Sequence, residues 1–260
     1  MKDIWESGDP YEYFMGRWSL LVGQTFLEWL SASPGRKWLD VGCGTGALSE
    51  AVLSTQNPSE LIAIDQSEGF VNSAQQRLGA SANCEVGNAT ALSFPDSKFD
   101  YVISGLVLNF IPEPEKALRE MKRVTTPDGT VAVYIWDYSG KMEFLKYFWD
   151  AVVELDPGAS DLHEGTRFPN ANSESLLHLF EDTEFANITV APLEIETKFK
   201  NFADYWKPFL GGQGPAPTYV LSLNEPDRNR LRDCLHEKLP IQEDGSIPLI
   251  ARAWAARGVV

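Results

Sequence analysis

The first half of the chain alternates short apolar runs with stretches of helical periodicity. The apolar runs, each followed by polar or glycine residues, occupy residues 37–41, 60–65, 84–89, 99–105 and 130–136. Before the last of them, one face of a helix predicted over residues 113–124 carries Ala117, Leu118, Met121 and Val124. Strands that alternate with helices are typical of βαβ units, so the pattern predicts an α/β fold with a doubly wound, mostly parallel sheet.

The second half supplies the two remaining strands of a predicted seven-stranded sheet. These strands are expected over residues 186–197 and within 245–257, and a short helix is expected over 173–180. Between the two strands, residues 201–242 hold aromatic, Gly/Pro-rich and charged segments, including a helix predicted over 225–239. A seven-stranded sheet does not require this stretch, so we expect a helical insertion between the last two strands.

Aromatic residues gather in a helix predicted over residues 142–155, and Gly and Pro mark a loop over 156–169. An aromatic stripe at helical spacing belongs more often to a core than to a pocket. We expect residues 138–170 and 201–242 to cap the strand ends; the alternative is a surface appendage used for dimerisation. The expected parts of the chain are an N-terminal helical segment (1–31), a central core (32–137) and the C-terminal half of the sheet (138–260).

The most informative stretch is residues 37–50, where an apolar strand carrying Asp40 runs into Gly42, Gly44 and Gly46 and then into a helix. Glycine permits the unusual backbone angles of such a turn and lets a ligand approach the main chain closely. The loop alone is ambiguous, because Gly42, Gly44 and Ala47 also satisfy the loose dinucleotide fingerprint.

A second acid follows in register with the glycine loop. Asp65 ends an apolar run 19 positions after Gly46. In a doubly wound sheet, an acid at this position lies beside the glycine loop and can accept hydrogen bonds from both hydroxyls of a ribose. Asp65 is therefore a candidate nucleoside-sugar ligand whichever nucleotide-containing cofactor the loop binds.

Taken in order, the glycine loop, Asp65, the Asn88-Ala89 pair and the segment from Ser104 to Leu106 resemble one known family. The chain is similar to the class I S-adenosylmethionine-dependent methyltransferases, of the broad group that includes the ubiquinone and menaquinone biosynthesis methyltransferases. The matching segments run from the N-terminal helix to about Asp137, roughly half of the chain. The resemblance implies that S-adenosylmethionine is the cofactor, that residues 32–137 bind it and that residues 1–31 cover it.

The resemblance assigns roles to individual residues of this core. Asp40 is expected to hold the methionine end of the cofactor, Asp65 its ribose, and Gln66 to lie beside the adenine. The family commonly carries Asp-Ala where this chain has Asn88-Ala89, and the side-chain oxygen of Asn can still accept a hydrogen bond from the adenine amino group. The remaining expected cofactor contacts are Gly42, Cys43 and Gly44 in the loop, and Ser104, Gly105 and Leu106 at the methionine portion.

In similar methyltransferases, a tyrosine and an arginine from the leading segment fold over the cofactor. Tyr13 and Arg17 match these positions, and Arg17 would face the cofactor's carboxylate, which suits the fork of a guanidinium. The alternative is that Arg17 begins an exposed helix while Tyr13 and Trp18 pack on the core.

Candidates for catalysis and for binding the methyl acceptor come from the later segments. Asn109 stands where the family often carries His, and an amide cannot act as a general base near neutral pH. Methyl transfer needs a base only if the nucleophile carries a proton, and in-line placement with exclusion of water supplies much of the rate. The candidate bases are Asp137, Tyr138 and His163, and the candidate acceptor-binding residues are Asn109, Trp206 and Gln213.

These features predict a methyltransferase that acts on a small apolar or aromatic metabolite and releases S-adenosylhomocysteine. Two alternatives stay open at this point. One is a catalytically silent protein that binds the cofactor or a partner. The other is an NAD(P)-dependent oxidoreductase, although Asp40 two residues before the first glycine is not typical of a dinucleotide loop.

Charge and cysteine content narrow the class of partner. With 22 basic and 37 acidic residues, the chain carries a net charge of −15, which disfavours a nucleic-acid substrate. Cys43, Cys84 and Cys234 are scattered, so neither a metal site nor the thiol cluster of an arsenic methyltransferase is expected. The first residues show no basic leader and no apolar segment long enough for a membrane, so we expect a cytoplasmic protein. The sequence does not reveal the oligomeric state.

Overall fold

The computed structural model describes residues 15–211 and 214–260. Within these residues, one seven-stranded sheet has the strand order β3-β2-β1-β4-β5-β7-β6, which confirms the predicted fold class. The pairings β3-β2, β2-β1, β1-β4 and β4-β5 are parallel. The strands are β1 (Lys37–Val41), β2 (Glu60–Asp65), β3 (Asn83–Val86), β4 (Phe99–Gly105), β5 (Thr125–Trp136), β6 (Ala186–Glu196) and β7 (Ile250–Val259).

The order of strands reverses between β1 and β4, which makes this pair the topological switch point of the sheet. Ligands of open α/β sheets bind outside the carboxyl ends of the strands at such a point. The residues that follow β1 and β4 therefore line the expected binding edge, and those that follow β2 and β3 continue it.

By its internal contacts the chain divides into two compact units, which are described separately. Of the described residues, the larger unit comprises 19–135, 170–193 and 253–260, and the smaller comprises 15–18, 136–169, 194–211 and 214–252.

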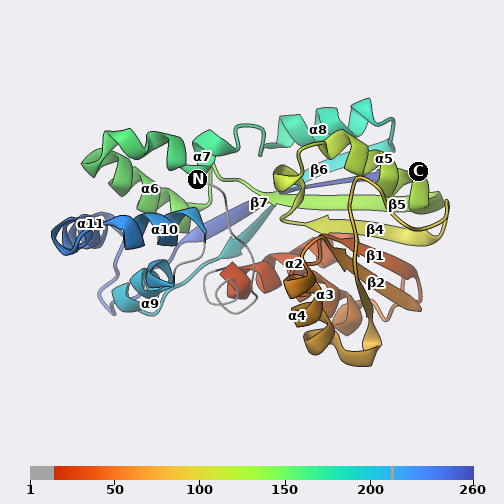
Figure 1. Ribbon diagram of the computed structural model, residues 1–260, viewed down its shortest axis with the longest axis horizontal. Helices are drawn as coiled ribbons and strands as arrows, with labels where there is room; N and C mark the ends of the chain where they lie inside the picture. Colours follow the sequence, from red (N-terminus) through yellow and green to blue (C-terminus); the bar gives the residue numbers. More distant parts are fainter. Residues whose placement is uncertain (1–14, 212–213) are drawn as a thin grey trace. The chain divides into compact units, whose positions relative to one another are not determined.

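In the larger unit, helices cover both faces of the sheet (Figure 1). One face carries α2 (Arg17–Leu30), α3 (Ala47–Thr55) and α4 (Glu68–Leu78), and the other carries α5 (Pro114–Val124) and α8 (Ser173–Asp182). The predicted apolar face of α5, formed by Ala117, Leu118, Met121 and Val124, is buried. Strands β1 and β2 are buried along nearly their whole length, as strands covered on both faces must be.

Strand β5 begins earlier than its sequence predicts. Residues 126–129 were expected to separate α5 from a strand starting at residue 130, yet the strand starts at Thr125. Phe99 pairs with Thr125 while Tyr101 pairs with Thr130, so the intervening residues bulge out of the ladder. Asp128, at φ 63°, makes the bulge possible.

The smaller unit contains the helical insertion that the sequence predicts between β6 and β7. Before β6, this unit contains α6 (Glu143–Leu155), η4 (Pro157–Leu162) and α7 (Glu164–Arg167). The insertion between β6 and β7 contains α9 (Phe202–Trp206), η5 (Lys207–Leu210), α10 (Pro215–Ser222) and α11 (Glu225–Lys238). The loop expected over residues 156–169 contains η4 and α7, and α10 starts at Pro215 within the Gly/Pro-rich part of the insertion. Proline at the first helical position is favourable, so these prolines begin helices rather than interrupt them.

The aromatic stripe of α6 is core, as the sequence favours. Phe144, Phe148 and Trp149 are each fully buried. Phe148 stacks on Phe209 of η5 with ring centroids 4.3 Å apart, and Phe144 lies 5.4 Å from Tyr205 of α9. Residues 142–155 therefore hold the insertion together.

Candidate functional site

The glycine loop after β1 combines packed positions with one open position. Gly42, Gly44 and Gly46 all have positive φ, at 78°, 54° and 87°. A Cβ at Gly42 would lie 2.6 Å from Val107, and one at Gly46 would lie 3.3 Å from Ala74, so both glycines are required for packing. A Cβ at Gly44 would meet nothing within 4 Å, which leaves this part of the loop open to a ligand.

Asp65 at the end of β2 ties two loops together. Its Oδ2 accepts a hydrogen bond from the Gly44 amide at 3.0 Å, and its Oδ1 accepts one from the Ser67 amide at 2.9 Å. Burial raises the pKa of Asp65, and these amide donors oppose the rise. Each oxygen retains acceptor capacity for a further donor such as a hydroxyl. The neighbouring Gln66 is exposed.

Asp40 in β1 is completely buried and only half satisfied. Its Oδ2 accepts a hydrogen bond from the Ser49 hydroxyl at 2.7 Å, whereas its Oδ1 has no partner among the described residues. Burial raises the pKa of Asp40 to about 7. The hydrogen bond from Ser49 opposes this rise, and the charge of Asp65 adds to it. A buried oxygen without a donor is costly, so Asp40 fits a site whose ligand or bound water supplies that donor.

Cys43, inside the glycine loop, serves packing. It is 7% exposed, and its amide donates to Ile64 O at 2.8 Å. Burial raises the pKa of the Cys43 thiol, which keeps it protonated and unreactive. Its backbone forms part of the loop, while its side chain fills the core.

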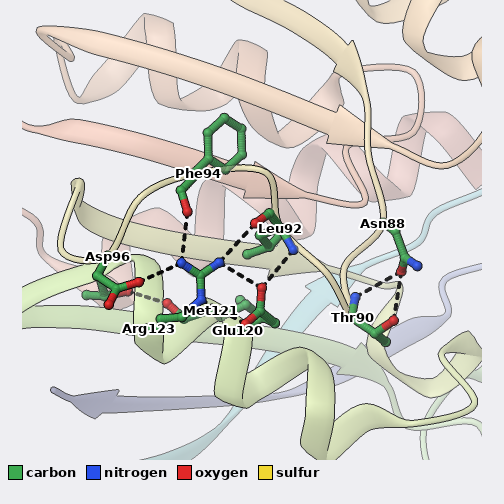
Figure 2. A network of polar contacts seen from close by, with 9 residues as sticks. Asn88, Thr90, Leu92, Phe94, Asp96, Glu120, Met121 and Arg123 are labelled. Carbon is green, nitrogen blue, oxygen red and sulfur yellow. Dashed lines mark hydrogen bonds and ion pairs between the residues drawn. The ribbon is translucent and has the colours of Figure 1, made fainter.

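The segment after β3 presents Asn88 in a defined orientation (Figure 2). Its Oδ1 accepts hydrogen bonds from both the amide and the hydroxyl of Thr90, at 2.9 and 3.0 Å. Asn88 itself is exposed, and Ala89 is half-buried. The sequence suggested Oδ1 as an acceptor for adenine, but this oxygen already has two donors, so the exposed group of Asn88 is Nδ2.

At the end of β4, Ser104 and Gly105 hold strands together. The Ser104 hydroxyl donates to Val41 O at 2.7 Å and is buried. A Cβ at Gly105 would lie 2.5 Å from the hydroxyl oxygen of Tyr134. Leu106, at φ 62°, donates its amide to Tyr134 O at 2.8 Å. These contacts shape the edge of the sheet at the switch point.

Asn109 lies in the short helix η3 (Leu108–Phe110) that follows this turn. Both Nδ2 and Oδ1 of Asn109 are buried, and neither has a partner among the described residues. The next residue, Phe110, is 42% exposed. An unpaired buried amide is destabilising by about 1–3 kcal/mol for each group, so Asn109 is a second candidate for contact with a ligand.

The catalytic candidate Asp137 lies in the smaller unit, where contacts within its own chain occupy both carboxylate oxygens. Oδ1 accepts from the Gly140 amide at 3.0 Å, and Oδ2 accepts from Arg252 Nε at 2.7 Å. The backbones of Asp137 and Arg252 are also hydrogen-bonded, at 2.9 Å. This arrangement fixes the turn after β5, and such a structural role accounts for the buried carboxylate without proton transfer.

Tyr138 and His163 are likewise engaged within the smaller unit. Tyr138 packs against Phe168 with ring centroids 5.2 Å apart. His163 Nδ1 accepts a hydrogen bond from the Gly165 amide at 2.9 Å and so caps α7. Burial lowers the pKa of His163, although Asp150, 3.8 Å from Nε2, opposes this effect. His163 therefore has a structural role as the cap of α7.

Arg17 pairs with a carboxylate of its own chain. Its Nη1 lies 3.2 Å from Asp204 Oδ1, and its guanidinium stacks 4.3 Å from the ring of Trp18. Trp206 is 9% exposed and packs against Phe209, which makes it part of the aromatic core. The other two candidates, Tyr13 and Gln213, lie outside the described residues.

Two polar groups of this edge were not found from the sequence. Ser49 supplies the hydrogen bond to Asp40, and Arg123 holds Leu92, which directly follows the turn at Asn88. Nothing in their local sequence marks them, because each acts on a residue distant in the chain. In the described part of the chain, no cluster of His, Cys, Asp and Glu could hold a metal ion. Nor is any described helix long and apolar enough to cross a membrane.

The buried Asp40 carboxyl predicts how stability depends on pH. Its pKa is raised from 3.8 to about 7 on folding, so the unfolded chain releases the proton at lower pH than the native protein. The resulting stabilisation is complete below pH 4 and is lost as the pH rises through 7. As the pH rises from 5 to 8, we expect the ionisation of Asp40 to lower the free energy of unfolding by at most about 3 kcal/mol.

Urea denaturation of wild type and of Asp40→Asn, each at pH 5 and pH 8, measures this contribution. The variant should show a smaller loss of stability between the two pH values, because its side chain does not titrate. Equal losses in both proteins would contradict the assignment of the buried titration to Asp40.

Comparisons with known proteins agree with this geometry. The family described as "Methyltransferase domain" matches residues 39–133. A demethylmenaquinone methyltransferase of Staphylococcus aureus is 31% identical over 172 residues, which cover 60% of this chain and 70% of that protein.

Solved structures show the same fold. A putative methyltransferase from an antibiotic biosynthesis pathway of Anabaena variabilis has a TM-score of 0.65 at 18% identity, covering 93% of this chain and 97% of the other. Phosphoethanolamine N-methyltransferase 2 of Haemonchus contortus, in complex with S-adenosyl-L-methionine, has a TM-score of 0.56 at 17% identity, covering 96% and 56%.

These relatives decide between the cofactors that the glycine loop alone leaves open. The donor is S-adenosylmethionine rather than a nicotinamide dinucleotide. Such a ligand fits three features of the described residues: the Asp40 oxygen that has no partner among them, the open position at Gly44 and the acceptor capacity of Asp65. The chain belongs to the class I S-adenosylmethionine-dependent methyltransferases.

Proposed function

We propose that this methyltransferase transfers the methyl group to a small apolar or aromatic metabolite that carries an oxygen substituent. The observation that supports the proposal lies in η3, where the buried Asn109 amide has no hydrogen-bond partner among the described residues and the next residue, Phe110, is partly exposed. An oxygen substituent can satisfy the amide while the ring covers an apolar surface. The relative from Staphylococcus aureus is named for demethylmenaquinone, a quinone with both features.

The proposed cofactor site follows the strand order along the carboxyl edge of the sheet. Asp40 and the glycine loop after β1 face the methionine portion, Asp65 after β2 accepts the ribose hydroxyls, and Asn88-Ala89 after β3 lies at the base. Parallel neighbouring strands present these groups side by side. This order matches the linear order of methionine, ribose and base within the cofactor.

The proposed chemistry needs little from ionisable side chains. S-adenosylmethionine supplies an electrophilic methyl group, and the protein has to orient the acceptor in line with it and exclude water. Asn109 can hold an acceptor oxygen but cannot remove its proton near neutral pH. An acceptor with an electron-rich aromatic ring, such as a hydroquinone, suits a site of this kind. We place the reaction in the cytoplasm.

The acceptor class is tested with methyl-labelled S-adenosylmethionine and a reduced demethylmenaquinone with a short side chain. We expect label in the naphthoquinol and one S-adenosylhomocysteine for each methyl group transferred. Asn109→Leu keeps the side-chain size but removes both polar groups, so kcat/KM for the quinol should fall about 10-fold. The affinity for S-adenosylhomocysteine should stay unchanged. Label found only on charged amines of a metabolite extract would contradict the proposed acceptor.

The ribose assignment is tested by Asp65→Ala. Loss of charge-assisted hydrogen bonds worth about 1.5–3 kcal/mol each should weaken S-adenosylhomocysteine binding at least about 10-fold in calorimetry. Asp100→Ala is a matched control, because Asp100 also accepts a backbone hydrogen bond, from the Lys37 amide at 2.8 Å, but at the amino end of β1. An unchanged dissociation constant in Asp65→Ala would remove Asp65 from the site.

A further inference from the structure

The connection between β3 and β4 is held by one side chain from α5 (Figure 2). The Arg123 guanidinium donates to Phe94 O at 2.8 Å, to Leu92 O at 2.9 Å and to Asp96 Oδ1 at 2.7 Å. Two of these acceptors are backbone carbonyls, so the guanidinium fixes the path of the main chain. Only arginine, with five donors in a rigid fork, can make this set of bonds.

Glu120, one turn earlier on α5, completes the clamp. It accepts from Arg123 Nε and Nη2, both at 2.8 Å, and its Oε2 also accepts from the Leu92 amide at 2.8 Å. The pairing with Arg123 lowers the pKa of Glu120. Farther along, the Ser97 amide donates to Arg123 O at 3.0 Å. The clamp therefore holds residues 92–97 at several points.

A tight turn at Asn88 immediately precedes the clamped segment, whose first residue, Leu92, is held through both its amide and its carbonyl. The Ala91 amide donates to Asn88 O at 3.0 Å, and Thr90 donates its amide and hydroxyl to Asn88 Oδ1. A backbone amide can only donate, so the atom of Asn88 that faces Thr90 must be the oxygen. The Nδ2 group, with its two N–H donors, then points away from the turn on an exposed residue.

This turn lies directly beside Asp65. The Gly87 amide donates to Asp65 O at 2.9 Å, which ties the end of β3 to the end of β2. A nucleoside whose ribose is bound at Asp65 therefore places its base next to Asn88. This step rests on the proposed placement of the ribose.

We propose that Asn88 recognises the cofactor's base as a hydrogen-bond donor through Nδ2, and that Arg123 is the positioning residue that keeps it in this orientation. The partner on the base is an unprotonated ring nitrogen, not the exocyclic amino group. A carboxylate in the place of Asn88 would do the opposite, since it can only accept and would pair with the amino group.

Two ligands that differ only at the exocyclic amino group distinguish donation by Asn88 to a ring nitrogen from acceptance of a hydrogen bond from that amino group. The first is S-adenosylhomocysteine, and the second is its 6-deamino analogue, whose purine carries hydrogen in place of the amino group. Both keep the ring nitrogens, so wild type should bind them within about 3-fold of each other in calorimetry. Asn88→Asp should prefer S-adenosylhomocysteine by about 5- to 10-fold, because its carboxylate needs the amino group.

The positioning role of Arg123 is tested by a double-mutant cycle. Asn88→Ala should weaken S-adenosylhomocysteine binding about 5-fold in wild type but less than 2-fold in Arg123→Lys, where the turn is no longer held. Arg119→Lys is the matched control: Arg119 lies on the same helix but pairs with Glu115 at the surface. In that background the full effect of Asn88→Ala should persist.

The outcomes separate this inference from the assignments on which it rests. A wild-type protein that rejects the deaminated analogue 10-fold or more would overturn the donor role of Asn88. Equal effects of Asn88→Ala in the wild-type and Arg123→Lys backgrounds would overturn the positioning role, even if Arg123→Lys lowers the melting temperature. If Asp65→Ala binds S-adenosylhomocysteine as wild type does while Asn88→Asp still discriminates, the ribose placement fails and the base contact stands.

Discussion

The two hydrogen bonds that Asp65 accepts hold the binding edge of the sheet together. One fixes the glycine loop through the Gly44 amide, and the other fixes the start of α4 through the Ser67 amide. The backbone of Asp65 also receives the Gly87 amide from the end of β3. A single residue at the end of β2 thus connects the ends of three neighbouring strands. Since these ends supply the proposed contacts to methionine, ribose and base, the geometry of the whole cofactor site depends on it.

The sequence predicted the parts of the fold that local rules determine. The strands from β1 to β4 and the helix α5 follow from apolar runs and helical spacing, and the glycine loop follows from the backbone angles that Gly42 and Gly44 require. The start of β5 could not be predicted, because the bulge after Thr125 depends on pairing with β4. The short helices in residues 156–169 depend on capping by Asp156 and His163, whose role appears only in three dimensions.

Local sequence indicates which polar residues stand at strand ends, but not the partners that distant segments bring to them. Asp40 and Asp65 stand at strand ends, where topology alone brings polar residues to a common edge. Asp137 stands at a strand end too, but Arg252, more than a hundred residues away, engages it in an ion pair. Spacing within the chain cannot reveal such a partner. The same holds for Arg123, whose helix was predicted but whose contacts with the segment after β3 were not.

Neutral amides at Asn88 and Asn109 have an electrostatic consequence for a site that already contains two buried acids. Asp65 raises the pKa of Asp40 through like-charge repulsion, in addition to the larger effect of burial. A third carboxylate at Asn88 would add to the negative potential at this edge, whereas the amide adds hydrogen bonds without charge. The donor carries a positive sulfonium that its product lacks. In the proposed placement, the Asp40 and Asp65 carboxylates attract the sulfonium donor more strongly than its product.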